Sequence, residues 1–139
     1  MRDLAASALS LSLLALFFAG ARVALDSRAH FARGEALRAR AEVSRSTRDW
    51  ERAAEAYTAS VESYVPFASH GRSALERVHQ IAEELATRGH GQSARQVLVR
   101  AAAAARALDC VFSPYAEESA RLEALTRPRA PALAAESQP

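Results

Sequence analysis

Cysteine, lysine and asparagine are rare in this chain or absent from it. It has one cysteine, Cys110, in 139 residues, and neither lysine nor asparagine occurs. A single cysteine excludes a disulfide within the chain. Because Cys110 ends an apolar helical stretch, we interpret it as a small packed side chain rather than a reactive thiol.

Recognisable catalytic and metal-binding motifs are absent as well. None of the four histidines has a second ligand at metal-binding spacing, and these are His30, His70, His79 and His90. Adjacent pairs such as Glu83 and Glu84 point about 100° apart on a helix, so they do not converge as paired carboxylates. No phosphate-binding loop or nucleophile elbow occurs. We therefore expect no enzyme activity, no cofactor and no metal.

The charges are mixed rather than clustered. The net charge is +2, all 18 basic residues are arginine, and no run of like charge exceeds two. A nucleic-acid surface would need a concentrated basic stripe or a known module, so we expect no nucleic acid as partner. High alanine and arginine contents are typical of a GC-rich bacterial genome, and they make arginine poor evidence for phosphate recognition.

A long apolar run opens the chain. Residues 4–21 carry no charge, and the apolar character resumes after Arg22 as far as Leu25. That length is sufficient for a helix to cross a hydrocarbon core about 30 Å thick. We predict that residues 1–25 are a single-pass anchor in a bacterial inner membrane. The alternative is a cleaved signal peptide, because Ala19-Gly20-Ala21 has the small-x-small form of a cleavage site.

Arginines follow the apolar run. By the positive-inside rule they place the rest of the chain in the cytoplasm, with a periplasmic location as the alternative. The residues concerned are Arg22, Arg28, Arg33, Arg38 and Arg40.

Residues 26–126 have helical periodicity throughout. Alanine and other apolar residues recur at spacings of 3 and 4 directly after the anchor, so they form a narrow stripe on one helix face. This stripe predicts that the anchor and the first helix of the domain are one long rod. Its members are Leu25, Ala29, Ala32, Ala36, Ala39 and Val43. Ser46 with Asp49 predicts the start of the next helix, which Pro66 ends. A third helix is predicted to begin near residues 69–73, where Ser73 with Glu76 forms a capping-box pattern.

The remaining elements are shorter. Arg88 and Gly89 predict the end of the third helix, and a fourth is expected over 93–110. Ser113 followed by Pro114 predicts the start of a fifth. The proline-rich residues 127–139 have too little apolar mass to fold, so we expect a disordered tail.

The chain also echoes itself at a shift of 48 positions, where Tyr64–Ala68 matches Phe112–Ala116. Together with Asp49–Tyr57, this pattern resembles the helical hairpins of tetratricopeptide repeats. The spacing of 41 between Ala53 and Ala94 departs from the 34 residues of that family. The resemblance implies an all-α domain of about four helices in antiparallel hairpins that binds proteins on a helix-lined surface.

Most of the aromatic residues of residues 26–126 gather near the predicted hairpin ends. We predict partner binding by these side chains, because tyrosine and tryptophan are enriched at binding hot spots. The alternative is that the rings fill a core rich in alanine. The six residues are Trp50, Tyr57, Tyr64, Phe67, Phe112 and Tyr115.

The sequence thus favours a membrane-anchored, all-α adaptor or accessory subunit of a bacterial envelope complex, with a protein as partner. Two alternatives stay open. The chain is either a self-associating membrane component whose anchor and alanine stripe pack against other copies, or a secreted or periplasmic binding protein after signal cleavage.

Overall fold

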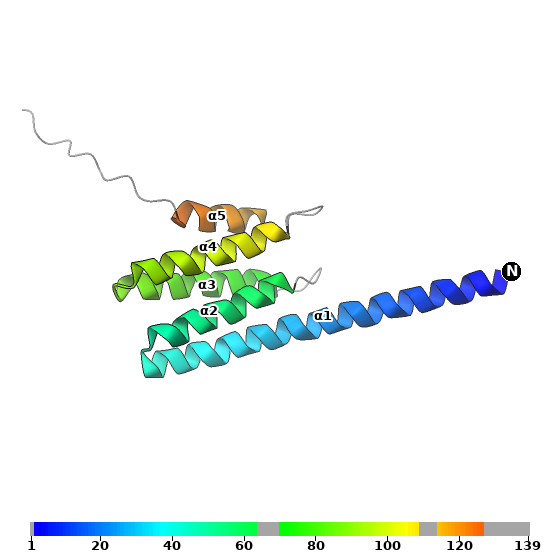
Figure 1. The fold of residues 1–139 in the computed structure, drawn as a ribbon, viewed down its shortest axis with the longest axis horizontal. Coiled ribbons are helices and arrows are strands. Elements are labelled where there is room, and N and C mark those ends of the chain that lie inside the picture. The colour runs from blue at the N-terminus through cyan, green and yellow to red at the C-terminus, as the bar shows by residue number, and fades with distance from the viewer. Residues whose placement is uncertain (1, 64–69, 109–113, 127–139) are drawn as a thin grey trace, which may run out of the picture.

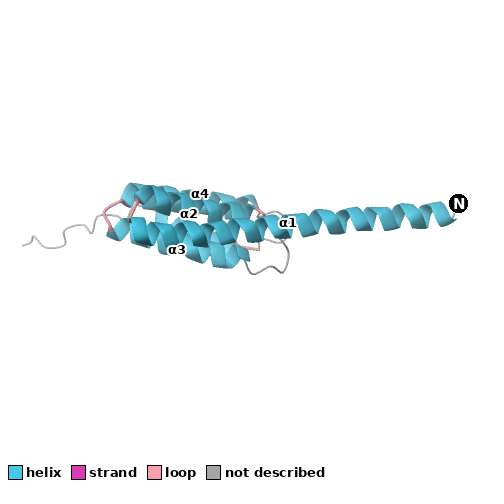
Figure 2. Ribbon diagram, turned by 90° about the horizontal axis from the view of Figure 1, so that it is seen from below, coloured by secondary structure: helices cyan, strands magenta, loops and turns pink. Residues whose placement is uncertain are grey.

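The computed structural model describes residues 2–63, 70–108 and 114–126. Within these ranges the chain is built of α-helices and contains no strand (Figures 1 and 2). This confirms the predicted all-α class, with an N-terminal apolar helix followed by a small antiparallel bundle. The helices are α1 (Arg2–Ser44), α2 (Thr47–Glu62), α3 (His70–Thr87), α4 (Gly91–Ala107) and α5 (Ala116–Thr126).

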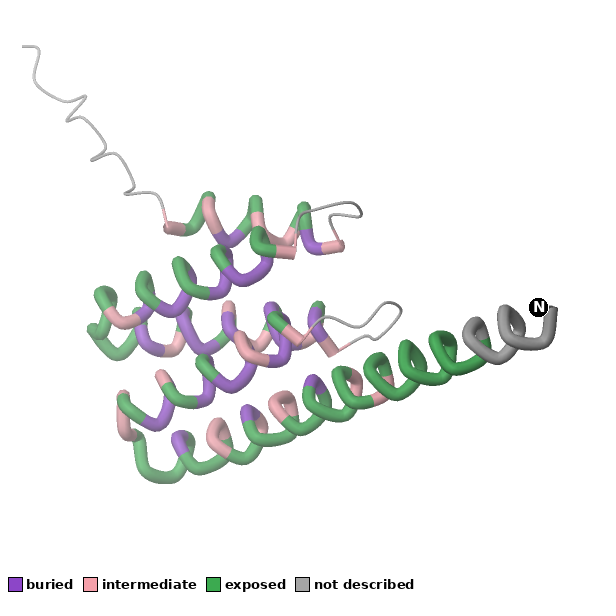
Figure 3. The backbone as a smooth tube through the Cα atoms, turned by 45° about the vertical axis from the view of Figure 1, so that its right-hand side comes forward, coloured by how far each residue is buried: buried purple, intermediate pink, exposed green. Residues whose placement is uncertain are grey.

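Helix α1 is one unbroken rod, as the sequence predicts. Its N-terminal half projects alone from the bundle, and its C-terminal half packs along α2 (Figures 1 and 3). The predicted boundary between anchor and domain, at residue 25, lies inside this helix. The rod ends at Arg45, whose φ of 53° lies in the left-handed region, and this turn reverses the chain into α2.

Consecutive helices run antiparallel. Helices α2, α3 and α4 pack on one another, and α5 lies along α4 on the side away from α1 (Figure 1). The buried positions, coloured purple, lie mainly on the parts of the helices that adjoin one another (Figure 3). Alanine dominates the core, so a few larger side chains fill its volume, and the fully buried ones are Tyr57, Leu75, Ile81, Leu85, Val61 and Val78.

Two predicted helix starts agree with the structure, but the predicted capping interactions do not form. Ser46 occupies the N-cap position of α2, but its side chain makes no capping hydrogen bond; instead, the Ser44 hydroxyl donates to Asp49 over 2.9 Å. Helix α3 begins at His70, within the predicted range 69–73, and Ser73 lies inside the helix, so the predicted capping box is wrong.

The stop at Gly89 is confirmed. Its φ of +84° is the left-handed conformation that glycine adopts without strain, and α4 starts two residues later. Helix α4 ends at Ala107, earlier than predicted, and α5 starts at Ala116 rather than directly after Pro114. Cys110 and the predicted tail 127–139 lie outside the described residues.

Two faces of α1 differ in burial: one packs against α2, and the other is exposed. The face against α2 carries small buried residues seven positions apart, Ser27, Gly34 and Ala41. The predicted alanine stripe lies on another face and is exposed along its whole length, with Leu25 67% and Val43 87% exposed. The stripe therefore takes no part in the core of this chain.

Candidate protein-interaction surface

Two hydrogen bonds join α2 to α1 close to the apolar half of α1. Buried Ser27 on α1 donates a hydrogen bond to the backbone carbonyl of Ser60 on α2 (3.1 Å), and the Ser60 hydroxyl donates to the carbonyl of Ser27 (2.9 Å). Ser27 follows Leu25 by two residues. The reciprocal pair thus joins the C-terminal end of α2 to the rod at the place where the apolar segment ends.

Tyr57 is the central aromatic residue of the α1–α2 contact. Its ring lies over Gly34, where an added Cβ would come 2.7 Å from Cδ1 and Cε1 of the ring. The edge of Phe31 meets the same ring, with the two centroids 5.4 Å apart. A glycine on α1 therefore makes room for a fully buried tyrosine on α2.

Charged groups surround the outer end of the Tyr57 ring. Glu35 accepts hydrogen bonds from Arg77 on α3 (3.0 Å) and from Arg38 (3.3 Å). Partial burial by itself raises the pKa of Glu35, but the Tyr57 hydroxyl and the two guanidinium groups outweigh it and lower that pKa below its usual value. Burial, reinforced by the Glu35 carboxylate, raises the pKa of Tyr57. This cluster links α1, α2 and α3 rather than forming a reactive site.

Trp50 and Tyr115 are also packed into the fold. Trp50 is buried near the α1–α2 turn, and the Arg88 guanidinium covers its ring at 5.4 Å from the centroid. Tyr115 is buried just before α5, where its hydroxyl occupies the space that a side chain on Gly71 would need. This contact places the residue before α5 against the first turn of α3.

The six aromatic residues predicted to bind a partner do not form one exposed cluster. Three of them are buried at separate places, and the other three, Tyr64, Phe67 and Phe112, lie outside the described residues. Burial of Trp50, Tyr57 and Tyr115 favours the alternative that these rings fill the core. Partner binding by the aromatic residues stays a prediction.

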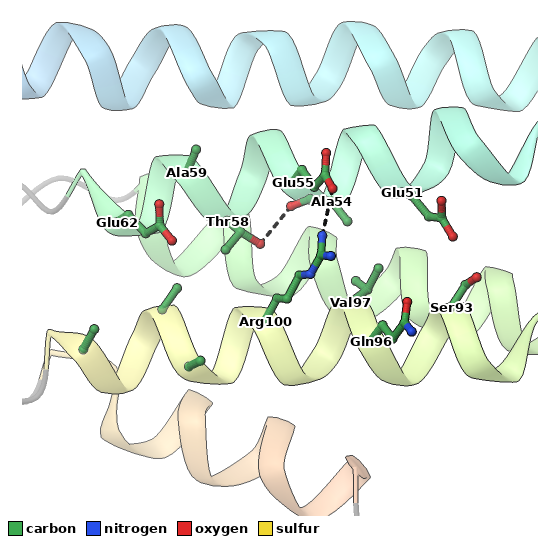
Figure 4. A pocket seen from close by; sticks show the side chains of 13 residues that line it. Glu51, Ala54, Glu55, Thr58, Ala59, Glu62, Ser93, Gln96, Val97 and Arg100 are labelled. Atoms are coloured by element: carbon green, nitrogen blue, oxygen red, sulfur yellow. Dashed lines mark hydrogen bonds and ion pairs between the residues drawn. The ribbon is translucent and has the colours of Figure 1, made fainter.

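A groove of about 590 Å³ lies between α2 and α4 (Figure 4). The α2 wall carries three carboxylates, Glu51, Glu55 and Glu62. Glu55 and Arg100 point toward one another across the groove and form an ion pair at 2.8 Å, with both side chains more than half exposed. Within the described residues, Glu51 and Glu62 have no ion-pair partner, so the groove carries excess negative charge.

Short side chains from both helices line much of the groove, so another helix can approach closely. They include Ala54, Ala59, Ala103, Ala104 and Ala107. Sequence reasoning missed this surface. The available signal was the spacing of Glu51, Glu55 and Glu62 on one face of a helix, but only the packing of α2 beside α4 shows that a hollow adjoins it.

Nothing in the described part of the chain resembles a metal centre, since no three His, Cys, Asp or Glu side chains there are grouped to hold an ion. Among the described helices, α1 alone is long and apolar enough to cross a membrane, a test that a signal sequence also passes. Comparison with known proteins gives no match to a protein-family model, a curated protein or a solved structure.

Proposed function

We propose that this chain is a single-pass bacterial membrane protein whose helical bundle is a non-catalytic protein-interaction module, an adaptor or accessory subunit of an envelope complex. The observation that carries the proposal is the continuity of α1. The same helix supplies the apolar projecting half and the first helix of the bundle, and no linker separates them. The bundle would therefore be held rigidly at the membrane surface.

The exposed apolar half of α1 supports membrane insertion. Only 6% of its most apolar window is buried in the structure, which differs from a core helix of a soluble protein. Large side chains such as Leu16 and Phe17 are each 70% exposed. Burying apolar surface gains about 25 cal/mol per Å², so a bilayer is the environment that suits this segment.

The bundle itself supports a binding role. Helices α1–α2 and α3–α4 form two antiparallel hairpins, with α5 covering α4, an arrangement consistent with the tetratricopeptide-like resemblance. We infer that the groove between α2 and α4 is the surface that receives a protein partner. The arginines after the apolar run favour a cytoplasmic location.

The test is a pull-down of the full-length chain, tagged at its C-terminus, from its own membranes in mild detergent. We expect a stoichiometric partner protein that is lost from the charge-reversed variant Glu51→Arg/Glu62→Arg. Arg95→Glu, an exposed change on α4 outside the groove, serves as the matched control. Recovery of the tagged chain with no other protein, or of a partner that ignores the groove variant, would contradict an adaptor that binds through this groove.

A second candidate function is self-association. The exposed stripe on α1 favours it, because no part of the chain that the structure describes packs on this apolar helix face at heptad spacing. Recovery of copies of this chain alone in the pull-down would favour this candidate.

A further inference from the structure

We propose that a pocket at the end of the bundle farthest from the apolar half of α1 binds a soluble phosphate group. The pocket has a volume of about 360 Å³ and lies between the last turns of α1, the first turn of α2 and the last turns of α3. The α1–α2 turn beside it is at the opposite end of the bundle from the projecting rod (Figure 1). Of the described residues, none lines both this pocket and the groove between α2 and α4.

Two residues that line this pocket carry buried donors with no acceptor in the described part of the chain. They are Trp50, through the indole Nε1, and Arg38, through the guanidinium Nε, and both atoms are shielded from solvent. Trp50 is only 5% exposed. A donor that is buried without an acceptor destabilises the fold, so both donors favour a ligand that brings oxygen acceptors into the pocket.

The charge of the pocket favours an anion. Three arginines line it, Arg38, Arg45 and Arg88, against the two carboxylates of Glu42 and Glu84. Both carboxylates are engaged within the chain, Glu42 by Arg38 at 3.1 Å and Glu84 by Arg88 at 2.6 Å. The exposed side chain of Arg45 pairs with no carboxylate of the described residues. One positive charge is therefore left for a ligand.

Arg88 covers the way to the indole. Its guanidinium lies over the Trp50 ring at 5.4 Å from the centroid. The Arg88 side chain is 30% exposed and is held by Glu84 on its own helical turn, so it can rotate toward solvent without unpacking the core. A ligand oxygen then reaches the indole N–H, and the displaced guanidinium binds the same anion.

The directions of the donors favour phosphate over a carboxylate. They come from three parts of the bundle, with Arg38 and Arg45 at the end of α1, Trp50 on α2 and Arg88 at the end of α3. A tetrahedral phosphate presents oxygens toward all three, whereas a planar carboxylate presents only two oxygens on one side. The planar fork of arginine also matches phosphate through paired N–H groups.

The position of the pocket along α1 excludes the phosphate of a lipid headgroup. Arg38 follows Leu25 by 13 residues, which is about 20 Å along a helix. The headgroup layer extends only about 5–8 Å beyond the hydrocarbon core. This step rests on the proposed membrane anchoring, whereas the donors and the charge of the pocket do not. The ligand is therefore a soluble phosphate.

The single tryptophan gives a direct test. Trp50 is the one tryptophan of the chain, so the ¹⁵N-labelled full-length protein in a maltoside detergent shows one indole N–H signal. Inorganic phosphate replaces chloride at constant ionic strength and pH. We expect a saturable downfield shift of the indole proton, because its N–H gains an oxygen acceptor. Acetate, or phosphatidylglycerol added to the micelles, should leave the signal unchanged.

Two arginine variants distinguish the pocket from a general attraction of anions. Arg45→Gln should raise the half-saturating phosphate concentration about tenfold or more, because it removes a charge-assisted contact. Since Arg45 pairs with no described carboxylate, its melting curve should match that of the wild type. Arg95→Gln removes the same charge from an exposed site on α4 outside the pocket, and phosphate binding should be unchanged.

Four results would overturn the proposal. No shift with phosphate would mean that the pocket binds no such anion. Equal weakening by Arg45→Gln and Arg95→Gln would mean that anions gather without a site. A shift with acetate but not with phosphate would assign a carboxylate instead. A shift with phosphatidylglycerol would assign a lipid and would also contradict the height of the pocket above the membrane.

Discussion

The ring of Tyr57 lies over Gly34, and this contact sets how closely α2 approaches α1. A Cβ on Gly34 would come 2.7 Å from two ring atoms, closer than real side chains tolerate. The large residue comes from α2 and the small one from α1, so the two positions depend on each other.

Gly34→Ala should lower the free energy of unfolding of the bundle by about 1–3 kcal/mol, because the buried ring or the helix must shift. The measurement is chemical unfolding of the full-length protein in mild detergent, followed by circular dichroism at 222 nm. Gly91→Ala is the control, since a Cβ there meets nothing within 4 Å. Equal stability of the two variants would contradict the close contact.

Two substitutions at Tyr57 should distinguish the contribution of the ring to stability from that of the hydroxyl. Tyr57→Ala leaves a cavity and should cost about 3–5 kcal/mol. Tyr57→Phe keeps the ring and removes only the hydroxyl, which lies beside Glu35 and helps to lower its pKa, so the loss of stability should be about 1 kcal/mol or less. A loss in Tyr57→Phe as large as that in Tyr57→Ala would contradict a main role for the ring.

The serine pair should behave as a coupled unit. Ser27→Ala or Ser60→Ala alone should cost about 1 kcal/mol or more, because each leaves a buried partner with an unmet hydrogen bond. The double variant should cost less than the sum of the two single variants. Strictly additive costs in a double-mutant cycle would contradict the reciprocal hydrogen bonds seen between α1 and α2.

The Glu35 cluster predicts a pH dependence. The pKa of Glu35 is lower in the folded state than its usual value of 4.5, so its stabilisation is present above that value and is lost as pH falls through the folded-state pKa. Since Glu35 is about one-third exposed, the effect should be about 0.2–1 kcal/mol. Glu35→Gln should remove it from unfolding curves collected between pH 6 and pH 3.

Glu76→Gln is the matched control for this titration, because Glu76 on α3 is an exposed carboxylate that pairs with no described arginine. Its unfolding curves should keep the acid dependence of the wild type. Loss of the same acid dependence in both variants would contradict a specific role for Glu35.

Much of the fold follows from local sequence signals. Gly89 ends α3 because a left-handed residue is needed there, and the uninterrupted spacing from the apolar run predicts α1 as one rod. The buried positions of α3, such as Leu75, Val78 and Ile81, also follow from spacings of 3 and 4. These signals act within one helix, so sequence alone reveals them.

Features that depend on two helices were not predictable in the same way. Alanine suits a buried or an exposed face equally, so the periodicity of the α1 stripe could not show that Gly34 faces α2 while Ala36 faces outward. The close contact of Tyr115 with Gly71 joins residues more than 40 positions apart. The groove exists only because α2 packs beside α4, and nothing local to either helix indicates that.

The measurement that tests the central claim most directly is the intact mass of the chain recovered from alkaline-washed membranes. The account predicts that the protein stays with the bilayer and keeps all residues of α1, including the apolar half. A soluble chain that begins at Arg22 would contradict it, because the bundle would then have no rod to hold it at a membrane.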